Sequence, residues 1–225
     1  MAAILKVSEL CLEVKGHPPK KLISNISFIL DQGKVLGIVG ESGSGKSLTA
    51  LSLTQLLPEN ICIHSGKVIL YDSGNEIELS SPNIKNIRKH RGKSISMIFQ
   101  EPMTSLNPSM KCGKQIEEAI LAHGKIKRSL LKQKVVSLLA EVLLPTPEML
   151  YNYYPHQLSG GQRQRLMIAM ALSADPIILI ADEPTTALDV SVQRNIIELL
   201  QNLRESRGLS IIFISHDLRL VRDFA

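Results

Sequence analysis

An eight-residue segment at positions 40–47 has the residue types and the spacing that hold a polyphosphate. Its sequence, GESGSGKS, has glycine, four residues, glycine, lysine and a hydroxyl residue in the order of a phosphate-binding loop. Its glycines let the backbone N–H groups of the loop, and the N-terminus of the following helix, point toward the phosphates. We expect Lys46 to reach the β- and γ-phosphates and Ser47 to bind Mg²⁺. The residues predicted to contact the nucleotide are Gly40, Glu41, Ser42, Gly43, Ser44, Gly45, Lys46 and Ser47.

Two carboxylates follow an apolar segment further along the chain. Residues 177–181 are Ile-Ile-Leu-Ile-Ala, and Asp182 and Glu183 come next. A strand that ends in carboxylates places hard oxygen ligands beside the phosphate-binding loop, so we expect Asp182 to bind magnesium. Glu183 lies one residue beyond the strand, where its side chain can hold the attacking water as general base. The same pair is common at a solvated strand end, and the loop at residues 40–47 favours the catalytic interpretation.

A Ser-Gly-Gly sequence at residues 159–161 lies where a helix is expected to begin. The residues that follow Gln162, RQRLMIAMAL, have a strong helical pattern. Ser159 and the two glycines would leave exposed N–H groups at the positive end of that helix, which can bind an anion. A flexible joint is the alternative, but the helical pattern favours a cap.

Apolar segments predict the strands that position these groups. Residues 35–39 are apolar on both faces, which predicts a buried strand of a mostly parallel sheet. Residues 67–79 contain the turn sequence Asp-Ser-Gly-Asn between two strand-like pieces, which predicts an antiparallel hairpin. The other predicted strands cover residues 3–14, 22–30, 177–180 and 210–214.

Helical periodicity predicts the remaining elements. Residues 103–157 carry apolar side chains at helical spacing, which indicates an inserted helical lobe. Further helices are expected from near Lys46, over about 160–172, and through residues 196–203. Strands that alternate with helices indicate an α/β sheet with right-handed crossover connections.

The composition is typical of a globular protein without a membrane span. The chain is 44% hydrophobic and 21% charged, and its apolar runs are too short to cross a bilayer. No export signal is evident at the N-terminus, which favours the cytoplasm. The net charge is +5, and the basic residues gather at 85–93 and 111–134, where solvated helix faces are the favoured interpretation. The three cysteines lack a C-x-x-C pair, so we expect buried or partly buried thiols.

The sequence LSGGQ at residues 158–162 resembles the signature of the ABC ATPases. In that family the segment contacts the γ-phosphate of ATP held by the other subunit. The resemblance therefore implies a dimer, with ATP and Mg²⁺ as cofactors. The residues that it assigns to this contact are Ser159, Gly160, Gly161 and Gln162.

The resemblance also implies a fold. It is an α/β fold with a P-loop NTPase, RecA-like core, an antiparallel β subdomain and an inserted helical subdomain that carries the signature. We expect one nucleotide-binding domain over residues 1–225, with the core at about 1–100 and 165–225 and the helical subdomain at about 101–164. The C-terminal part of the family's domain is expected to be absent.

Three further positions match family elements in order. Gln100 follows Met-Ile-Phe and resembles the glutamine that joins the core to the helical lobe and approaches Mg²⁺ and water. Asp189, in Ala-Leu-Asp, resembles the aspartate loop that crosses the dimer interface. His216, in Ile-Ser-His-Asp, resembles the switch histidine that contacts the γ-phosphate, and its place after an apolar strand outweighs the structural role of most lone histidines. The predicted catalytic residues are Glu183, His216 and Gln100, and the predicted metal ligands are Ser47, Gln100 and Asp182.

Longer strings narrow the resemblance to bacterial oligopeptide, dipeptide and nickel importers. They are GIVGESGSGKS, MIFQEPMTSLNP, YPHQLSGGQRQRLMIAMAL and IADEPTTALDVSVQ. This resemblance implies an ATP-binding subunit that lies peripherally on the cytoplasmic face of the inner membrane. The implied partners are a second nucleotide-binding domain, in a homodimer or heterodimer, integral membrane permease subunits and, indirectly, a substrate-binding protein. Cargo cannot be derived from these residues, because specificity lies in the binding protein and the membrane subunits.

Two departures from the family leave alternatives open. Family members stack adenine on an aromatic residue near the N-terminus, but residues 14–19 offer only His17. The chain ends at Ala225, which is consistent with one part of a longer or two-domain protein. A soluble ABC-type ATPase acting on nucleic acid or ribosomes is the alternative function. DNA-repair members carry long insertions that the 55 residues of 103–157 are too few to form, so no nucleic acid partner is expected.

Overall fold

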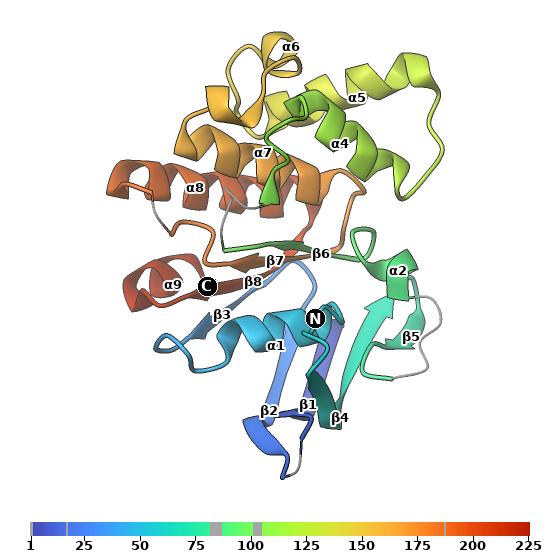
Figure 1. Cartoon of the computed structure of the whole chain (residues 1–225), viewed down its shortest axis with the longest axis vertical. Coiled ribbons are helices and arrows are strands. Elements are labelled where there is room, and N and C mark those ends of the chain that lie inside the picture. The colour runs from blue at the N-terminus through green and yellow to red at the C-terminus, as the bar shows by residue number, and fades with distance from the viewer. Residues whose placement is uncertain (1, 17, 82–86, 101–104, 187) are drawn as a thin grey trace.

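Within the residues that the structure describes, two four-stranded sheets organise the chain (Figure 1). The computed structural model describes residues 2–16, 18–81, 87–100, 105–186 and 188–225. The antiparallel sheet has the order β2-β1-β4-β5, and the parallel sheet has the order β3-β8-β7-β6. The predicted α/β fold with an added antiparallel sheet is confirmed.

The antiparallel sheet contains a bulge that keeps its apolar face on the core. Val7 and Leu10 of β1 are both buried, although strict alternation would put them on opposite faces. Glu9, between them, has a positive φ of 50°, and the register with β2 shifts at this point. A Cβ on Gly66 would lie 2.5 Å from the Glu9 carbonyl oxygen, so only glycine fits opposite the bulge. The strands are β1 (Ala3–Val14), β2 (Lys20–Asp31), β4 (Ile61–Asp72) and β5 (Asn75–Glu78), and β4 and β5 form the predicted hairpin.

The parallel sheet brings the functional segments to one edge. Its strands are β3 (Val35–Val39), β6 (Ile95–Ile98), β7 (Ile178–Asp182) and β8 (Ser210–Ser215), and all of its pairings are parallel. Strands that run in the same direction end at the same edge. The segments that leave this edge begin at Gly40, Phe99, Glu183 and His216, so four sequence-distant loops meet there.

The expectation that residues 35–39 form a buried strand is wrong in one respect. The strand exists, but four of its residues are only half-buried, and Val39 is 40% exposed. The reason is its place in the sheet: β3 is at an end of the strand order and pairs with β8 alone. An apolar sequence does not distinguish an edge strand from a central one.

Helices cover both faces of the parallel sheet (Figure 1). On one side, α1 lies between this sheet and the antiparallel sheet. On the other side lie α7 and α8, with α4, α5 and α6 stacked beyond them as the predicted helical lobe. The helices are α1 (Lys46–Leu53), α2 (Ile87–His90), α4 (Cys112–Leu121), α5 (Arg128–Glu141), α6 (Pro147–Leu150), α7 (Gly160–Leu172), α8 (Val190–Arg207) and α9 (Leu218–Phe224), with a 3₁₀ turn at Pro155–Gln157.

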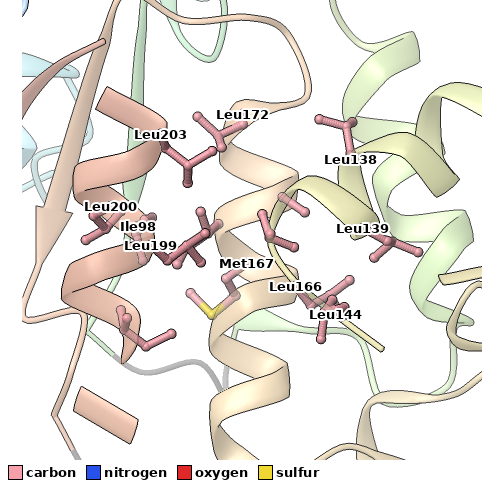
Figure 2. Close-up of a cluster of buried hydrophobic side chains, with 14 of the residues drawn as sticks. Ile98, Leu138, Leu139, Leu144, Leu166, Met167, Leu172, Leu199, Leu200 and Leu203 are labelled. Carbon is pink, nitrogen blue, oxygen red and sulfur yellow. The ribbon is translucent and has the colours of Figure 1, made fainter. Parts of the chain in front are cut away.

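Two apolar cores lie on the two sides of the parallel sheet. On β7, Leu179 belongs to the core shared with the helices of the lobe, whereas Ile178 and Ile180 belong to the core shared with the antiparallel sheet. Figure 2 shows the first core, in which α7 lies between α8 and α5, with Leu172 near Leu203 and Leu166 near Leu144. Helix α7 therefore joins the lobe to the sheet through continuous apolar packing.

The three cysteines are free thiols, as expected. Cys11 and Cys62 are half-buried, and Cys112 is buried. Burial raises the pKa of the Cys112 thiol to about 11, which leaves it protonated and unreactive at neutral pH.

Candidate active site

The phosphate-binding loop joins β3 to α1 in a conformation that needs glycine. Gly43 and Gly45 have φ angles of 81° and 96°. A Cβ on Gly40 would lie 2.7 Å from the Ser44 hydroxyl oxygen. Gly45 is the N-cap of α1 and makes no side-chain cap, and the first turn carries no acidic residue. The N–H groups at this helix start are therefore available to phosphate oxygens.

Lys46 is held inside this loop. Its side chain is largely buried, and its ammonium group donates hydrogen bonds of 2.9 Å to the carbonyl oxygens of Gly40 and Glu41. Neutral carbonyls bind an ammonium group less strongly than a charged phosphate does. The loop therefore orients the lysine and leaves it able to exchange these partners for phosphate.

Glu183 is the centre of the polar contacts at the carboxyl edge of the sheet. Its backbone has a φ of 46°, a left-handed conformation that turns the side chain out of the β7 strand, and its N–H donates to the Ile214 carbonyl at 2.9 Å. One carboxylate oxygen accepts from the Gln100 amide at 3.1 Å and from the Thr186 hydroxyl at 2.9 Å. The ring Nδ1 of His216 lies 3.3 Å from the same oxygen. The structure thus brings the three predicted catalytic side chains together.

Asp182 is a buried carboxylate with unused ligand capacity. It is 3% exposed, and its Oδ1 atom has no hydrogen-bond partner among the described residues. Burial raises the pKa of Asp182, and the neighbouring Glu183 carboxylate adds to this, whereas a hydrogen bond from Ser47 and the charge of Lys46 act in the opposite direction. A buried, under-coordinated carboxylate is costly without a cation.

These oxygen atoms fit a magnesium ion that also binds phosphate. Ser47 supplies a hydroxyl oxygen and Asp182 supplies a carboxylate oxygen, and both are hard ligands of the kind that Mg²⁺ prefers. No group of three or more His, Cys, Asp or Glu side chains that could hold a metal occurs in the described part of the chain. Ser47 and Asp182 supply two oxygen ligands, so nucleotide oxygens and water would complete the shell of the ion.

His216 is presented on a short loop that is fixed on both sides. The Asp217 N–H donates to the Ser215 hydroxyl at 3.0 Å, and the Asp217 carboxylate accepts from the Arg219 N–H at 2.8 Å, which caps α9. The His216 side chain itself is 61% exposed. The ring therefore stands at the mouth of the site beside Glu183, where it can contact a bound phosphate.

The predicted signature segment begins α7 with a reciprocal cap. The Ser159 hydroxyl accepts from the Gln162 N–H at 3.3 Å, and the Gln162 side-chain oxygen accepts from the Ser159 N–H at 3.0 Å. The side-chain oxygen of Gln162 is thus engaged within its own chain. The N–H groups of Gly160 and Gly161 and the Ser159 hydroxyl remain as the groups at this helix end that can meet an anion.

Asp189 caps α8 beside the signature glycines. Its carboxylate accepts from the Ser191 hydroxyl at 2.6 Å and the Val192 N–H at 3.0 Å, and these bonds lower its pKa. A Cβ on Gly161 would lie 2.7 Å from a methyl carbon of Val192, and one on Gly160 would lie 3.3 Å from a methyl carbon of Leu188. The two glycines therefore let the starts of α7 and α8 approach closely.

One pocket is lined by part of the predicted site, but the signature residues do not line this pocket. A cavity of about 230 Å³ is lined by Ser42, Gly43, Gly45, Lys46, Ser47, Leu48, Gln100 and Glu183. This cavity is not lined by residues 159–162 or by Asp189. His17, the candidate adenine contact, lies outside the described residues.

Two contributors to the site are absent from the predicted residues. Thr186 hydrogen-bonds the Glu183 carboxylate, and Gln193 ties its amide to the carbonyls of Thr185 and Leu188 at 3.2 Å each. Both lie within the string IADEPTTALDVSVQ, which is the only signal for them. Their contacts depend on how the chain turns after Glu183, which periodicity does not reveal.

Comparison with curated proteins finds transport ATP-binding proteins. The oligopeptide transport ATP-binding protein OppD of Bacillus subtilis is 47% identical over 223 residues, which cover 99% of this chain and 62% of OppD. The dipeptide transport ATP-binding protein DppD of Lactococcus lactis is 48% identical, over 91% of this chain and 58% of DppD. The glutathione import ATP-binding protein GsiA of Escherichia coli is 47% identical, over 90% of this chain and 33% of GsiA. The chain thus spans less than two thirds of each of these relatives.

Solved structures share the fold. A dimeric post-hydrolysis state of the ATP-binding cassette MJ0796, bound to ADP and Pi, superposes with a TM-score of 0.81 at 28% identity, over 97% of this chain and 90% of that one. The protein cbiO1 of Clostridium perfringens, part of the cbiONQ transporter complex, also gives 0.81, at 27% identity over 100% of this chain and 83% of that one.

The family follows from a family model that matches most of the chain. A family model described as ABC transporter matches residues 23–186, which include the phosphate-binding loop, the signature and the two carboxylates. Across the part of the chain that the structure describes, no helix has both the length and the apolar character of a membrane span. The chain belongs to the ABC transporter family.

Proposed function

We propose that this chain is the ATP-hydrolysing subunit of an importer, and that two such domains close head to tail around two ATP molecules. The single observation that carries the catalytic part is the contact set of Glu183: a carboxylate turned out of its strand, held by Gln100 and Thr186, at the wall of the phosphate-binding pocket. A fixed carboxylate at that position can orient a water molecule for attack on the γ-phosphate.

The chemistry follows from the positions of these groups. Water attacks the γ-phosphorus, Glu183 accepts a proton from that water, the bond to the β-phosphate oxygen breaks, and ADP and inorganic phosphate leave. Lys46 and the N–H groups of the loop stabilise the charge on the transferred group. His216, whose ring lies 3.3 Å from the Glu183 carboxylate, would contact the oxygens of that group. Ser47, Asp182 and Gln100 would hold Mg²⁺, which would neutralise phosphate charge.

The site requires a second nucleotide-binding domain. The N–H groups at the start of α7 can bind phosphate, but residues 159–162 do not line the chain's own pocket. In the proposed dimer, Ser159, Gly160, Gly161 and Gln162 of each domain face the ATP held by the other, and Asp189 lies at the interface. Because one chain carries both halves, a homodimer is chemically possible, and a heterodimer with a related subunit satisfies the same geometry.

Transport is the preferred role because of the relatives' names. OppD, DppD and GsiA are named for oligopeptide, dipeptide and glutathione transport. We propose peptides as the cargo class, with nickel as the second candidate, and permease subunits and a binding protein as the partners that select it. The subunit would lie peripherally on the cytoplasmic face of the membrane. No observation on the described residues favours the alternative of a nucleic acid or ribosome ATPase.

We propose a division of the chain into two working parts. Residues of about 1–100 and 165–225 form the catalytic core, and those of about 101–164 form the helical subdomain that carries the signature. Closure and reopening of the dimer would drive the membrane subunits between inward- and outward-facing states. Gln100, which contacts Glu183 directly, is the proposed link between chemistry and motion.

Replacing Glu183 with glutamine is expected to keep MgATP binding and to lower turnover by about 100-fold or more, because the amide keeps the shape but cannot accept the proton. The measurement is ATP hydrolysis by the assembled dimer, with ATP affinity followed by calorimetry. Glu198→Gln, at an exposed position of α8, is the matched control and should leave turnover unchanged. Near-normal hydrolysis by Glu183→Gln would refute its role as the base.

Replacing Asp182 with asparagine is expected to stabilise the nucleotide-free protein while it abolishes magnesium-dependent hydrolysis. Because burial raises the pKa of Asp182, ionisation at pH 7 destabilises the fold, and the amide removes that charge. Thermal unfolding at pH 7 should shift upward by roughly 2–4 °C, the effect of ~1 kcal/mol in a chain of this size.

The gain from Asp182→Asn has a defined pH dependence. It should shrink as the pH falls toward about 4, the ordinary carboxyl pKa, because the wild-type group then becomes neutral as well. Asp223→Asn, at an exposed end of α9, controls for net charge. A lower melting temperature for Asp182→Asn at pH 7 would contradict the account of a costly buried charge.

MgATP is expected to dimerise the Glu183→Gln protein, whereas the unsubstituted chain should remain mostly monomeric. Bound γ-phosphate supplies contacts to both domains, and hydrolysis removes them. Light scattering with and without MgATP measures this. High activity from a proven monomer, with a rate strictly first order in protein concentration, would contradict the shared site.

A further inference from the structure

Arg207, the last residue of α8, contacts three other segments at once. Its Nε and Nη2 atoms donate to the two carboxylate oxygens of Glu141, at the end of α5, at 2.5 Å each. Its Nη1 atom donates to the Asp175 carboxylate at 3.0 Å and to the Leu172 carbonyl oxygen, at the end of α7, at 3.3 Å. Lys134 of α5 lies 3.3 Å from the other oxygen of Asp175. One guanidinium group thus joins α8 to the lobe and to the end of the signature helix.

The geometry makes this contact stronger than an ordinary surface ion pair. Two parallel N–H donors meet both oxygens of Glu141, and the two side chains are only 20% and 32% exposed. The pKa of Arg207 is raised, mainly by its hydrogen bonds to the Glu141 carboxylate, whereas burial acts to lower it. The bond to Leu172 satisfies a carbonyl at the negative end of α7, where a cation is favourable.

Helix α8 holds α7 at its other end as well. At that end Gly161 packs against Val192 of α8 so closely that a Cβ would not fit. At the C-terminal end of α7, Leu172 also makes an apolar contact with α8, where it lies beside Leu203 (Figure 2). The steric contact at Gly161 and the hydrogen bond at Leu172 are about 16 Å apart along α7, at 1.5 Å per residue.

We propose that Arg207 is a positioning residue for the signature: by anchoring the C-terminal end of α7 and the end of α5 to α8, it fixes the direction in which Ser159 and the following N–H groups face the partner's nucleotide. This inference rests on the proposed shared site. Without Arg207, the described residues hold the C-terminal end of α7 to α8 only by apolar packing, and apolar packing fixes the direction of a helix less sharply than directional hydrogen bonds do. A hydrogen bond to phosphate tolerates little misdirection. Loss of Arg207 therefore impairs closure of the dimer and leaves the chain's own phosphate-binding loop intact.

The chain provides a matched control on the same helix. Arg204 is one turn earlier and pairs with its own neighbour Glu205, so its ion pair joins no other element. Arg204→Gln and Arg207→Gln remove the same charge from the same helix end. A difference between them reports the link to α5 and α7 rather than net charge or helix propensity.

The experiment compares these variants in the hydrolysis-blocked Glu183→Gln protein. Calorimetry with MgATP at low protein concentration measures binding to the monomer, and light scattering measures MgATP-driven dimerisation. Arg207→Gln is expected to bind ATP within about twofold of its parent and to dimerise about tenfold more weakly. Arg207→Lys keeps the charge but loses the paired donors, so its dimerisation should be weakened to a similar degree. Arg204→Gln should dimerise as strongly as the parent.

A double variant tests the Glu141 contact itself. If Arg207 acts through Glu141, Glu141→Gln weakens dimerisation too, and adding it to Arg207→Gln weakens dimerisation little further. In the dimerising, catalytically competent chain, Arg207→Gln should lower kcat and leave KM nearly unchanged.

The outcomes separate this inference from the proposed function. If the Glu183→Gln parent itself fails to dimerise with MgATP, the shared-site proposal is wrong. If the parent dimerises and Arg207→Gln dimerises equally well, the positioning role is wrong and the shared site stands. Equal weakening by Arg204→Gln, or a matching loss of monomer ATP affinity, also overturns the positioning role, because both indicate a general effect on stability.

Discussion

Parallel pairing of β3, β8, β7 and β6 is the constraint on which the rest of the site depends. Because the strands run in the same direction, the phosphate-binding loop, Gln100, Glu183 and His216 all leave the sheet at one edge. Segments separated by up to about 175 residues in the sequence therefore meet without any further folding device. Glu183 and His216 directly follow the adjacent strands β7 and β8, and this explains their contact.

Two residues at this edge are held in states that would be unfavourable elsewhere. Glu183 adopts a left-handed backbone conformation, and Asp182 keeps a buried carboxylate oxygen without a hydrogen-bond partner among the described residues. The surrounding contacts impose both: the Glu183 N–H bonds to β8, and the fully buried strands β7 and β8 fix the position of Asp182. Backbone strain and unfavourable burial of charge that occur together are typical of a site that binds a charged ligand.

Much of this arrangement is predictable from the sequence because it depends on local patterns. The loop GESGSGKS, the apolar strand before Asp182 and the Ser-Gly-Gly helix start each signal their structure within a few residues. The edge position of β3 is not predictable in this way, because an apolar strand looks the same wherever it pairs. Periodicity also does not predict α9, the contact of Thr186 with Glu183 or the contacts of Arg207. These features depend on which distant elements become neighbours.

In the proposed dimer, each chain contributes two parts of the ATP sites from separate surfaces. The phosphate-binding loop and Glu183 line one pocket, and the N-terminal end of α7 lies outside it, capped by Ser159 and with Gly160 and Gly161 against the start of α8. Helix α8 connects these surfaces, because Asp189 at its start borders the signature and Arg207 at its end anchors the lobe. In the proposed mechanism, the orientation of the lobe on the core therefore decides whether two domains can close.

The most direct measurement of the shared site is complementation between two inactive chains. Lys46→Ala disables the loop, and Ser159→Arg blocks the signature, so each variant alone has no intact site when it pairs with itself. A mixture forms dimers in which one loop and one signature are both intact. The account predicts that each variant alone hydrolyses ATP at background rate and that mixing restores a substantial part of the activity. Full activity from Ser159→Arg alone, or no recovery from mixed chains that demonstrably dimerise, would contradict it.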